Sequence, residues 1–121
     1  MDRKYSIDKM NGIIAVRFNE GPEAIDICNS LDDAARIRPG NLRLWDFTCG
    51  ADLTNDDIQI VANHAKSIQL PAGRVAIVAP QDLSFGVFRV YAAHREQTQV
   101  KLSVFRSEQE ALDWLKNDSV E

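Results

Sequence analysis

The sequence predicts an α/β domain: a mostly parallel sheet with an antiparallel first strand, flanked by helices. Short apolar, β-branched segments alternate with segments of helical periodicity in the order β-β-α-β-α-β-α-β-α. Strands separated by helices need crossover connections, so the later strands should run parallel. The chain of 121 residues is 45% hydrophobic and 26% charged. It therefore has room for one core, and we expect a single domain over residues 1–121.

Two short antiparallel strands are predicted at the N-terminal end. Tyr5 and Ile7 alternate with polar residues, and residues 13–18 form an apolar, β-branched run. Asn11-Gly12 lies between the two runs and is a strong hairpin signal, because both residue types tolerate positive φ.

The first predicted helix follows Gly21-Pro22-Glu23, since proline suits the first turn of a helix. Its apolar positions recur at helical spacing and are Ala24, Ile27, Cys28, Leu31 and Ala35. Pro39-Gly40 stops this segment, and residues 42–47 predict the third strand.

The second predicted helix follows a loop that ends at Leu53. Thr54 is its expected N-cap, because the threonine hydroxyl can accept the backbone N–H of Asp57. One face of this helix is apolar and consists of Ile58, Val61, Ala62, Ala65 and Ile68. Pro71-Ala72-Gly73 ends it.

The C-terminal half continues the alternation. Residues 75–79 form an unbroken apolar run, which predicts a strand buried on both faces and closed by Pro80. Asp82 is expected to cap a third helix that runs to about Gln97. Residues 100–105 alternate as the last strand, and residues 107–110 form a capping box for a final helix. The turn residues expected between elements are Gly12, Pro22, Pro39-Gly40, Pro71 to Gly73, and Pro80.

Charge and composition exclude several classes of function. Lys and Arg number 14 against 18 Asp and Glu, so the net charge is −4, which argues against nucleic-acid binding and against attraction to an anionic membrane. No run approaches the roughly 20 apolar residues of a membrane span. The N-terminal residues lack the apolar stretch of a signal peptide, so we expect a cytoplasmic protein. Cys28 and Cys49 are then expected to be reduced thiols.

No catalytic constellation is recognisable. The six glycines form neither a nucleotide-binding loop nor the glycine–serine motif of α/β-hydrolases. His64 and His94 lie outside any metal-ligand spacing and are expected to be partly exposed and uncommitted. Asp46, inside the predicted third strand, is interpreted as a loop-capping or turn-forming carboxylate rather than a catalytic one. We therefore expect no enzymatic activity, no cofactor and no metal.

The third predicted helix carries two apolar stripes where a surface helix normally needs one. The first consists of Leu83, Val87, Val90, Tyr91 and His94, and the second of Phe85, Phe88 and Ala92. Core packing, a second subunit and an apolar ligand would each explain the doubled face. For the second subunit, we expect the first stripe to pack on the sheet while Phe85 and Phe88 point outward and are covered in a homodimer. The candidate interface or ligand surface is Phe85, Phe88, Tyr91 and Ala92.

Several stretches together carry a family resemblance. They are Leu-Arg-Leu-Trp-Asp-Phe at residues 42–47, Val-Ala-Ile-Val-Ala-Pro at 75–80, residues 85–91, and Glu-Ala-Leu-Asp-Trp-Leu at 110–115. Through them the chain resembles the STAS-like, SpoIIAA-like family of bacterial proteins over nearly its whole length. These stretches are mostly structural, so they indicate a fold more than an activity.

The resemblance implies a non-enzymatic regulatory or protein-interaction domain. Typical members are anti-sigma-factor antagonists, which bind a partner protein and are switched by phosphorylation at the start of the helix after the third strand. The matching stretch here contains Asp52, Thr54 and Asn55, with Thr54 as its only hydroxyl. We expect self-association as a homodimer or binding to another protein. The alternative is a small carrier of an apolar or lipid-like ligand, lined by Phe85, Phe88 and Tyr91, because the fold also resembles the lipid-binding CRAL-TRIO domain.

Overall fold

The structure, a computed structural model, describes residues 4–38, 40–68, 72–95 and 100–117. These residues form five strands and four helices in the predicted order. The strands are β1 (Tyr5–Met10), β2 (Ile13–Phe18), β3 (Leu42–Asp46), β4 (Gly73–Val78) and β5 (Val100–Phe105). The helices are α1 (Ala24–Ala35), α2 (Asn55–Ser67), α3 (Asp82–His94) and α4 (Glu108–Lys116).

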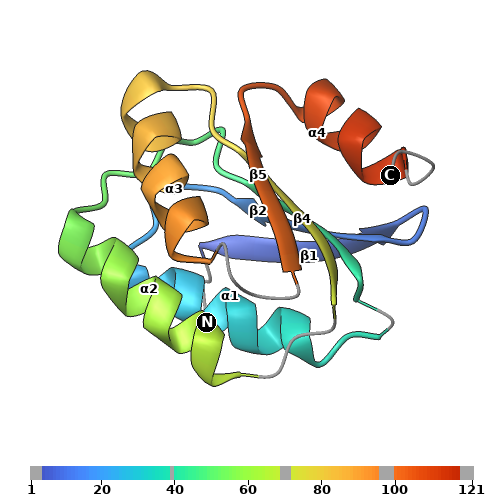
Figure 1. The fold of residues 1–121 in the computed structure, drawn as a ribbon, viewed down its shortest axis with the longest axis horizontal. Helices are drawn as coiled ribbons and strands as arrows, with labels where there is room; N and C mark the ends of the chain where they lie inside the picture. The colour runs from blue at the N-terminus through green and yellow to red at the C-terminus, as the bar shows by residue number, and fades with distance from the viewer. Residues whose placement is uncertain (1–3, 39, 69–71, 96–99, 118–121) are drawn as a thin grey trace.

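The strands form one sheet in the order β1-β2-β3-β4-β5 (Figure 1). β1 pairs antiparallel with β2, and the other neighbouring strands pair in parallel, which confirms the predicted fold class. Parallel strands that follow one another in space need crossovers of the same hand, so α1, α2 and α3 fall on one face of the sheet. β4 lies between β3 and β5, as its continuous apolar run predicts.

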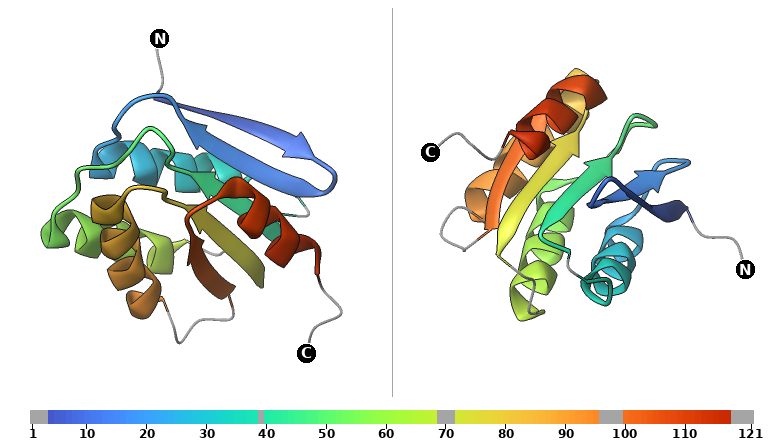
Figure 2. Two further views of the ribbon diagram at one scale, coloured as in Figure 1. Left: turned by 90° about the horizontal axis from the view of Figure 1, so that it is seen from above. Right: turned by 90° about the vertical axis from the view of Figure 1, so that its right-hand side faces the viewer.

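Three layers result, because α4 covers the opposite face of the sheet (Figure 2). The core beneath α1, α2 and α3 is the larger one and contains most of the buried aromatic rings. The core beneath α4 is small and aliphatic, and its buried members are Ile13, Ala15, Leu44, Ala76, Val78, Ala111 and Leu115. None of the helices in the described part of the chain has the length and apolar character needed to cross a bilayer.

The predicted hairpin turn and the predicted N-cap of α2 are confirmed, and the predicted capping box of α4 is confirmed in part. Asn11 and Gly12 have φ of 53° and 80°, as a tight hairpin requires. The Thr54 hydroxyl accepts the Asp57 N–H at 3.1 Å, and the Asp57 carboxylate accepts the Thr54 N–H at 2.9 Å. At α4, Ser107 accepts the Glu110 N–H at 3.2 Å, which is one half of the expected capping box.

Two helix starts differ from prediction. Asp82 is the first residue of α3 rather than its cap, and Gln81 occupies the cap position without a side-chain hydrogen bond. The Asp82 carboxylate instead accepts a hydrogen bond from Arg106 at 2.6 Å. The two residues of this ion pair are 24 positions apart in the chain, so local sequence patterns do not reveal it. Pro22 precedes the N-cap Glu23, so it lies outside the first turn of α1.

Gly73 was expected between elements and is instead the first residue of β4. A β-carbon at this position would lie 1.9 Å from the carbonyl oxygen of Asn41, which accepts the Arg74 N–H at 2.9 Å. The glycine therefore permits the close start of the β3–β4 ladder. Gly12, Pro22, Gly40 and Pro80 lie between elements, as predicted. Pro39, Pro71 and the expected end of the third helix near Gln97 lie outside the described residues.

The rotation of α3 about its axis contradicts the prediction. Phe88 is 2% exposed and belongs to the core, whereas Leu83 and Val90 are 66% and 41% exposed. The Phe88 ring stacks on Phe47 with centroids 4.2 Å apart, and this contact turns the helix. Because α3 is apolar on more than one side, its sequence does not determine which side faces the sheet. The prediction that Phe85 and Phe88 both point outward is wrong.

Candidate functional site

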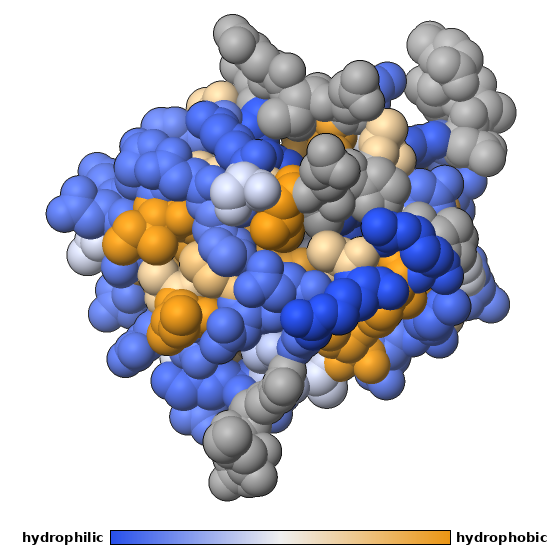
Figure 3. Space-filling model, turned by 90° about the horizontal axis from the view of Figure 1, so that it is seen from below, coloured by the Kyte–Doolittle hydropathy of each residue, from blue (hydrophilic) through white to orange (hydrophobic). Residues whose placement is uncertain are grey.

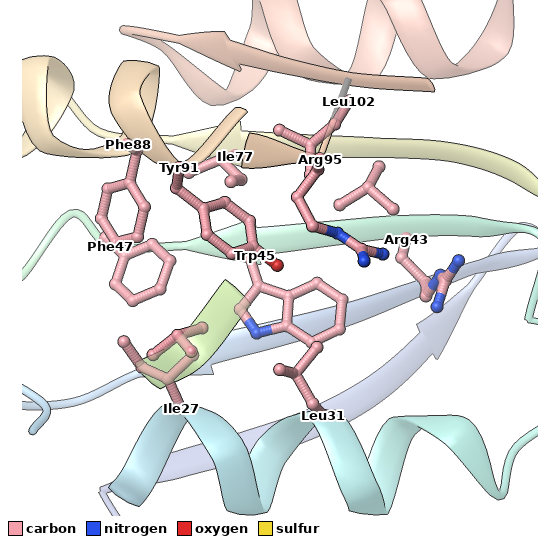
Figure 4. Close-up of a pocket in the computed structure, with 12 residues that line it drawn as sticks. Ile27, Leu31, Arg43, Trp45, Phe47, Ile77, Phe88, Tyr91, Arg95 and Leu102 are labelled. Atoms are coloured by element: carbon pink, nitrogen blue, oxygen red, sulfur yellow. The ribbon is translucent and has the colours of Figure 1, made fainter. Parts of the chain in front are cut away.

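A cavity of about 30 Å³ lies between the sheet and the helices α1, α2 and α3 (Figure 4). Ten of its twelve lining residues are apolar or aromatic, and the other two are arginines. The lining comprises Ile27, Leu31, Arg43, Trp45, Phe47, Val61, Val75, Ile77, Phe88, Tyr91, Arg95 and Leu102.

Strand and helix periodicity place the key side chains on this cavity. Alternation along β3 and the residue after it directs Arg43, Trp45 and Phe47 to the same face of the sheet. On α3, Phe88 and Tyr91 are three residues apart, and Arg95 follows four residues later at the C-cap. These spacings put the three side chains on one side of the helix, facing the sheet.

One end of the cavity is aromatic and tightly packed. Phe47 stacks on Phe88 on one side and on Phe18 on the other, at centroid distances of 4.2 and 4.6 Å. In the wall beside them, the Trp45 Nε1 donates to the Ser30 hydroxyl at 3.2 Å. The buried indole is therefore satisfied and held in place, and its ring faces the cavity (Figure 4).

The other end of the cavity is cationic. Arg43 is 1% exposed and Arg95 is 4% exposed, and Figure 4 shows both guanidinium groups at the end away from Phe47 and Phe88. Burial, and then the neighbouring charge of Arg95, lower the pKa of Arg43 to about 10. Arg43 is therefore still charged at neutral pH, and the cavity runs from an aromatic end to a positively charged end.

Tyr91 joins the two ends. Its ring lines the cavity, and its hydroxyl shares a hydrogen bond with Arg95. Burial raises the pKa of the Tyr91 phenol, so the group is neutral at physiological pH. Arg43 and Arg95 make further interactions in the structure, and neither is a free cation.

The predicted surface of Phe85, Phe88, Tyr91 and Ala92 is divided by the structure. Phe88 and Tyr91 line the cavity, while Phe85 and Ala92 are half-buried outside it. The Phe85 ring lies beneath the guanidinium of Arg106, whose central carbon is 4.2 Å from the ring centroid. Phe85 and Phe88 therefore do not form one exposed patch.

The predicted switch loop is not part of the cavity. Asp52, Thr54 and Asn55 are exposed, and none of them is among its lining residues. The Thr54 hydroxyl is used in the N-cap of α2. The structure thus gives this threonine a stabilising role in α2.

The other residues considered for chemistry have structural partners. The Asp46 carboxylate accepts the Thr48 N–H at 2.8 Å, as a loop-capping role predicts, and it also accepts from Arg17 at 2.7 Å. His64 was expected to be uncommitted, but its Nε2 lies 2.8 Å from an Asp32 oxygen, which links α2 to α1. His94 is exposed.

Within the described ranges, no group of three or more His, Cys, Asp or Glu residues could hold a metal ion. Cys28 and Cys49 are free thiols, and burial raises the pKa of each. A raised thiol pKa disfavours the reactive thiolate form.

Sequence reasoning missed Arg43 and Arg95. A signal for Arg43 was present, since it shares the parity of Trp45 in the predicted third strand and so faces the same side of the sheet as Trp45. Arg95 follows Tyr91 by four residues and Phe88 by seven, which places it on their face of α3. Recognising that face required knowing the rotation of the helix.

Comparison with known proteins supports the fold. No family model matches the chain, and no curated protein matches its sequence. The chain is similar to the crystal structure of an uncharacterised DUF3478-family protein with a SpoIIAA-like fold from Shewanella loihica. The two share 24% identity with a TM-score of 0.51, covering 92% of this chain and 91% of the other. The likeness confirms the SpoIIAA-like fold that the sequence resemblance implied, and it shows the fold alone.

Proposed function

We propose that this protein is a non-enzymatic binding protein for a small apolar or amphipathic ligand, held between α3 and the sheet. The observation that carries the proposal is the largely apolar cavity, whose wall includes Trp45, Phe47, Phe88 and Tyr91. Ligand sites are typically concave and apolar with a few polar groups that fix orientation, and this cavity has that composition. It is also the site where residues expected to line an apolar ligand pocket, Phe88 and Tyr91, come together.

The size of the cavity limits the ligand. About 30 Å³ is room for two or three water molecules, because one water occupies roughly 10–15 Å³ on this measure. A ligand the size of a phenyl ring therefore needs the walls of the cavity to move apart. We expect small aromatic or short aliphatic compounds to bind first.

Trp45 provides a direct test. The chain has two tryptophans, so Trp114→Phe leaves Trp45 as the only one, and its fluorescence then reports on the cavity. Titration with alkanols from butanol to decanol and with phenylalkanols should give a saturable change. Affinity should increase with apolar size, by about 0.8 kcal/mol for each added CH₂ that is buried, until the cavity is filled.

The control is a variant in which a larger side chain fills the cavity. Val61 lies in the wall on α2 and is 2% exposed, so Val61→Phe should occupy the space and abolish binding while the protein remains folded. Ile60 is the neighbouring residue and is 53% exposed, so Ile60→Phe should leave binding unchanged. The proposal is wrong if no compound gives a saturable signal, or if Val61→Phe binds as well as Ile60→Phe.

A second candidate function is self-association through the outer side of α3. Leu83 and Val90 are exposed and seven residues apart, with half-buried Val87 between them, so they form one stripe on the helix. On the face that Figure 3 draws, apolar surface is divided into separate patches by hydrophilic side chains. The proposed partner is a second copy of this chain, because one stripe can serve both subunits of a symmetric dimer.

Light scattering tests this candidate. The unmodified chain should have the mass of a dimer, and Leu83→Ser with Val90→Ser should have the mass of a monomer with an unchanged circular dichroism spectrum. A monomeric unmodified chain would rule the dimer out.

A further inference from the structure

The described residues leave one side of β5 without a neighbouring strand. β5 pairs with β4 and ends the sheet, between α3 on one face and α4 on the other (Figure 1, Figure 2). The Phe105 carbonyl oxygen accepts the Ala79 N–H at 2.8 Å, so the backbone groups of Phe105 point toward β4. Because backbone groups alternate in direction along a strand, the N–H and C=O of Leu102 and Val104 point away from the sheet. These outward groups of Leu102 and Val104 are here called the open edge.

β1, at the other border of the sheet, has a different character. Its Asp8 and Lys9 are exposed, and charged side chains on an edge strand disfavour pairing with another chain. In β5 only Lys101 is exposed, whereas residues 102–105 are all half-buried. The residues paired with them in β4, 75–78, are buried between two strands. The side chains of β5 therefore retain the exposure expected of a strand that lacks one neighbour.

Cationic side chains border the open edge. Lys101 is exposed near the start of β5, and Arg106 follows its last residue. Arg89 on α3 lies near Arg106, because their guanidinium carbons are 5.8 and 4.2 Å from the centroid of the same ring, Phe85. Arg106 pairs with Asp82 at 2.6 Å, but no described residue forms an ion pair with Arg89 or Lys101. The border of the sheet thus carries positive charge in a chain whose net charge is −4.

We infer that the open edge binds an extended, acidic segment of a partner protein, which pairs with β5 as a sixth strand of the sheet. Backbone hydrogen bonds to Leu102 and Val104 supply the affinity of such a contact, and carboxylates near Arg89 and Lys101 supply its selectivity. Apolar side chains in the middle of the segment cover the half-buried residues of β5. The inference goes beyond the proposed function, because it concerns the border of the sheet and not ligand binding in the cavity.

Charge favours an acidic segment over a second copy of this chain. Antiparallel pairing of two β5 edges would place the α3 helices of both copies on the same face of the joined sheet. The Arg89 side chains would then lie on that face together, and the Lys101 side chains would lie together on the other. Like charges across an interface are unfavourable, whereas an acidic segment neutralises them.

Three fluorescein-labelled peptides test the inference by fluorescence anisotropy. The first is Glu-Glu-Val-Thr-Val-Glu-Glu with blocked ends, which combines strand-forming residues with carboxylates at both ends and should bind saturably. The second has Lys in place of each Glu and should bind at least about tenfold more weakly. The third is the acidic peptide with methyl groups on its three central amide nitrogens. It should not bind, because a methylated amide cannot donate a hydrogen bond to β5.

Amide hydrogen exchange locates the contact. In the free chain, the Leu102 and Val104 amides should exchange rapidly, whereas the Ser103 amide, which points toward β4, should exchange slowly. A saturating amount of the acidic peptide should slow Leu102 and Val104 at least about tenfold and leave Ser103 nearly unchanged. This pattern of alternate residues is specific for an added strand.

Variants of β5 provide a second test. Val104→Pro removes an outward N–H but no hydrogen bond to β4, so it should abolish peptide binding with an unchanged circular dichroism spectrum. Val104→Thr keeps the N–H and should bind normally. Lys101→Met should weaken binding of the acidic peptide about threefold, and Lys66→Met, at an exposed position on α2, should not change it. If Val104→Pro does not fold, the methylated peptide makes the same test on the unmodified chain.

Several results would overturn the inference. It is wrong if the acidic peptide does not bind, if the methylated peptide binds equally well, or if Leu102 and Val104 are not protected in the complex. Equal binding of the acidic and the lysine peptides would contradict the acidic character of the partner. If the free chain is a dimer in which Leu102 and Val104 are already protected, a second copy occupies the open edge and the inference is overturned.

Discussion

An arginine on each face of the sheet shows how differently the two cores are built. Arg17, on the face covered by α4, donates to Asp46 at 2.7 Å and to Glu108 at 2.6 Å. These partners, first the hydrogen bond to Glu108, raise the pKa of Arg17. Arg43, on the opposite face, is buried beside Arg95, and its pKa is lowered to about 10. The surroundings of Arg17 therefore favour its charged form, whereas the surroundings of Arg43 disfavour the charged form.

The remaining residues of the two cores follow the same contrast. The core beneath α4 is filled by small aliphatic side chains such as Ala76 and Leu115, which are fully buried. The core beneath α1, α2 and α3 contains stacked rings, a cavity and the buried side chains of Arg43 and Arg95. The α4 side of the sheet is therefore filled by aliphatic packing, whereas the side of α1, α2 and α3 contains the cavity on which the proposed function rests.

The largest expected effect is at Phe88. Phe88→Ala removes the ring that stacks on Phe47 and should lower the free energy of unfolding by about 3–5 kcal/mol in urea denaturation. Phe85→Ala, at a half-buried position, is the matched control and should cost clearly less. Equally small losses for the two would mean that both rings point outward, as the sequence suggested.

Next is Leu115, at the centre of the α4 core. Leu115→Ala should lower the free energy of unfolding by about 2–4 kcal/mol, because a fully buried leucine leaves a new void. Its binding of phenylalkanols should not change, since Leu115 lies on the far side of the sheet from the cavity. A loss of binding in a variant that remains folded would break the separation between the two faces.

Exchanging the two arginines for methionine tests the contrast directly. Arg17→Met leaves two carboxylates without their partner and should lower the free energy of unfolding by about 2 kcal/mol. Arg43→Met removes a buried charge together with the interactions that Arg43 makes in the structure, and should also lower the free energy of unfolding, by at least about 2 kcal/mol. Thermal and urea denaturation at neutral pH measure both. An Arg43→Met variant as stable as the unmodified chain would show that the cost of burying this charge outweighs the interactions that it makes.

The smallest effect concerns the caps of one helix in each outer layer. Thr54→Ala removes half of a complete capping box at α2 and should cost about 1 kcal/mol. Ser107→Ala removes a single cap bond at α4 and should cost less. If host-cell partners are retained equally by Thr54→Ala and Thr54→Asp in pull-down experiments, a phosphorylation switch at this loop is excluded.

Local signals predicted most of the fold. Asn11-Gly12, the Thr54 cap and the apolar run at residues 75–79 each act within a few residues, so their meaning does not depend on the rest of the chain. They were confirmed in the structure. Strand ends at Phe47 and Ala79 differ by one residue, as is common for element boundaries.

The site was predicted only in part, because it depends on which way α3 faces. Phe88 and Tyr91 were recognised as candidates for an apolar ligand, but Phe88 was also assigned to an exposed pair with Phe85. The ring stack with Phe47, a residue 41 positions earlier in the chain, decides between these possibilities. Arg95 could be placed at the cavity only after that contact was known.

By itself, the sequence determined the order of the elements, the parallel sheet and the capping of α2, since periodicity and turn chemistry are local properties. The tertiary structure alone decided the rotation of α3, the partner of His64 and the meeting of Arg43 with Arg95. The physical reason is that a helix with two apolar sides has two nearly equivalent ways to pack. Contacts between distant segments, here Phe88 on Phe47, choose one of them and thereby create the cavity.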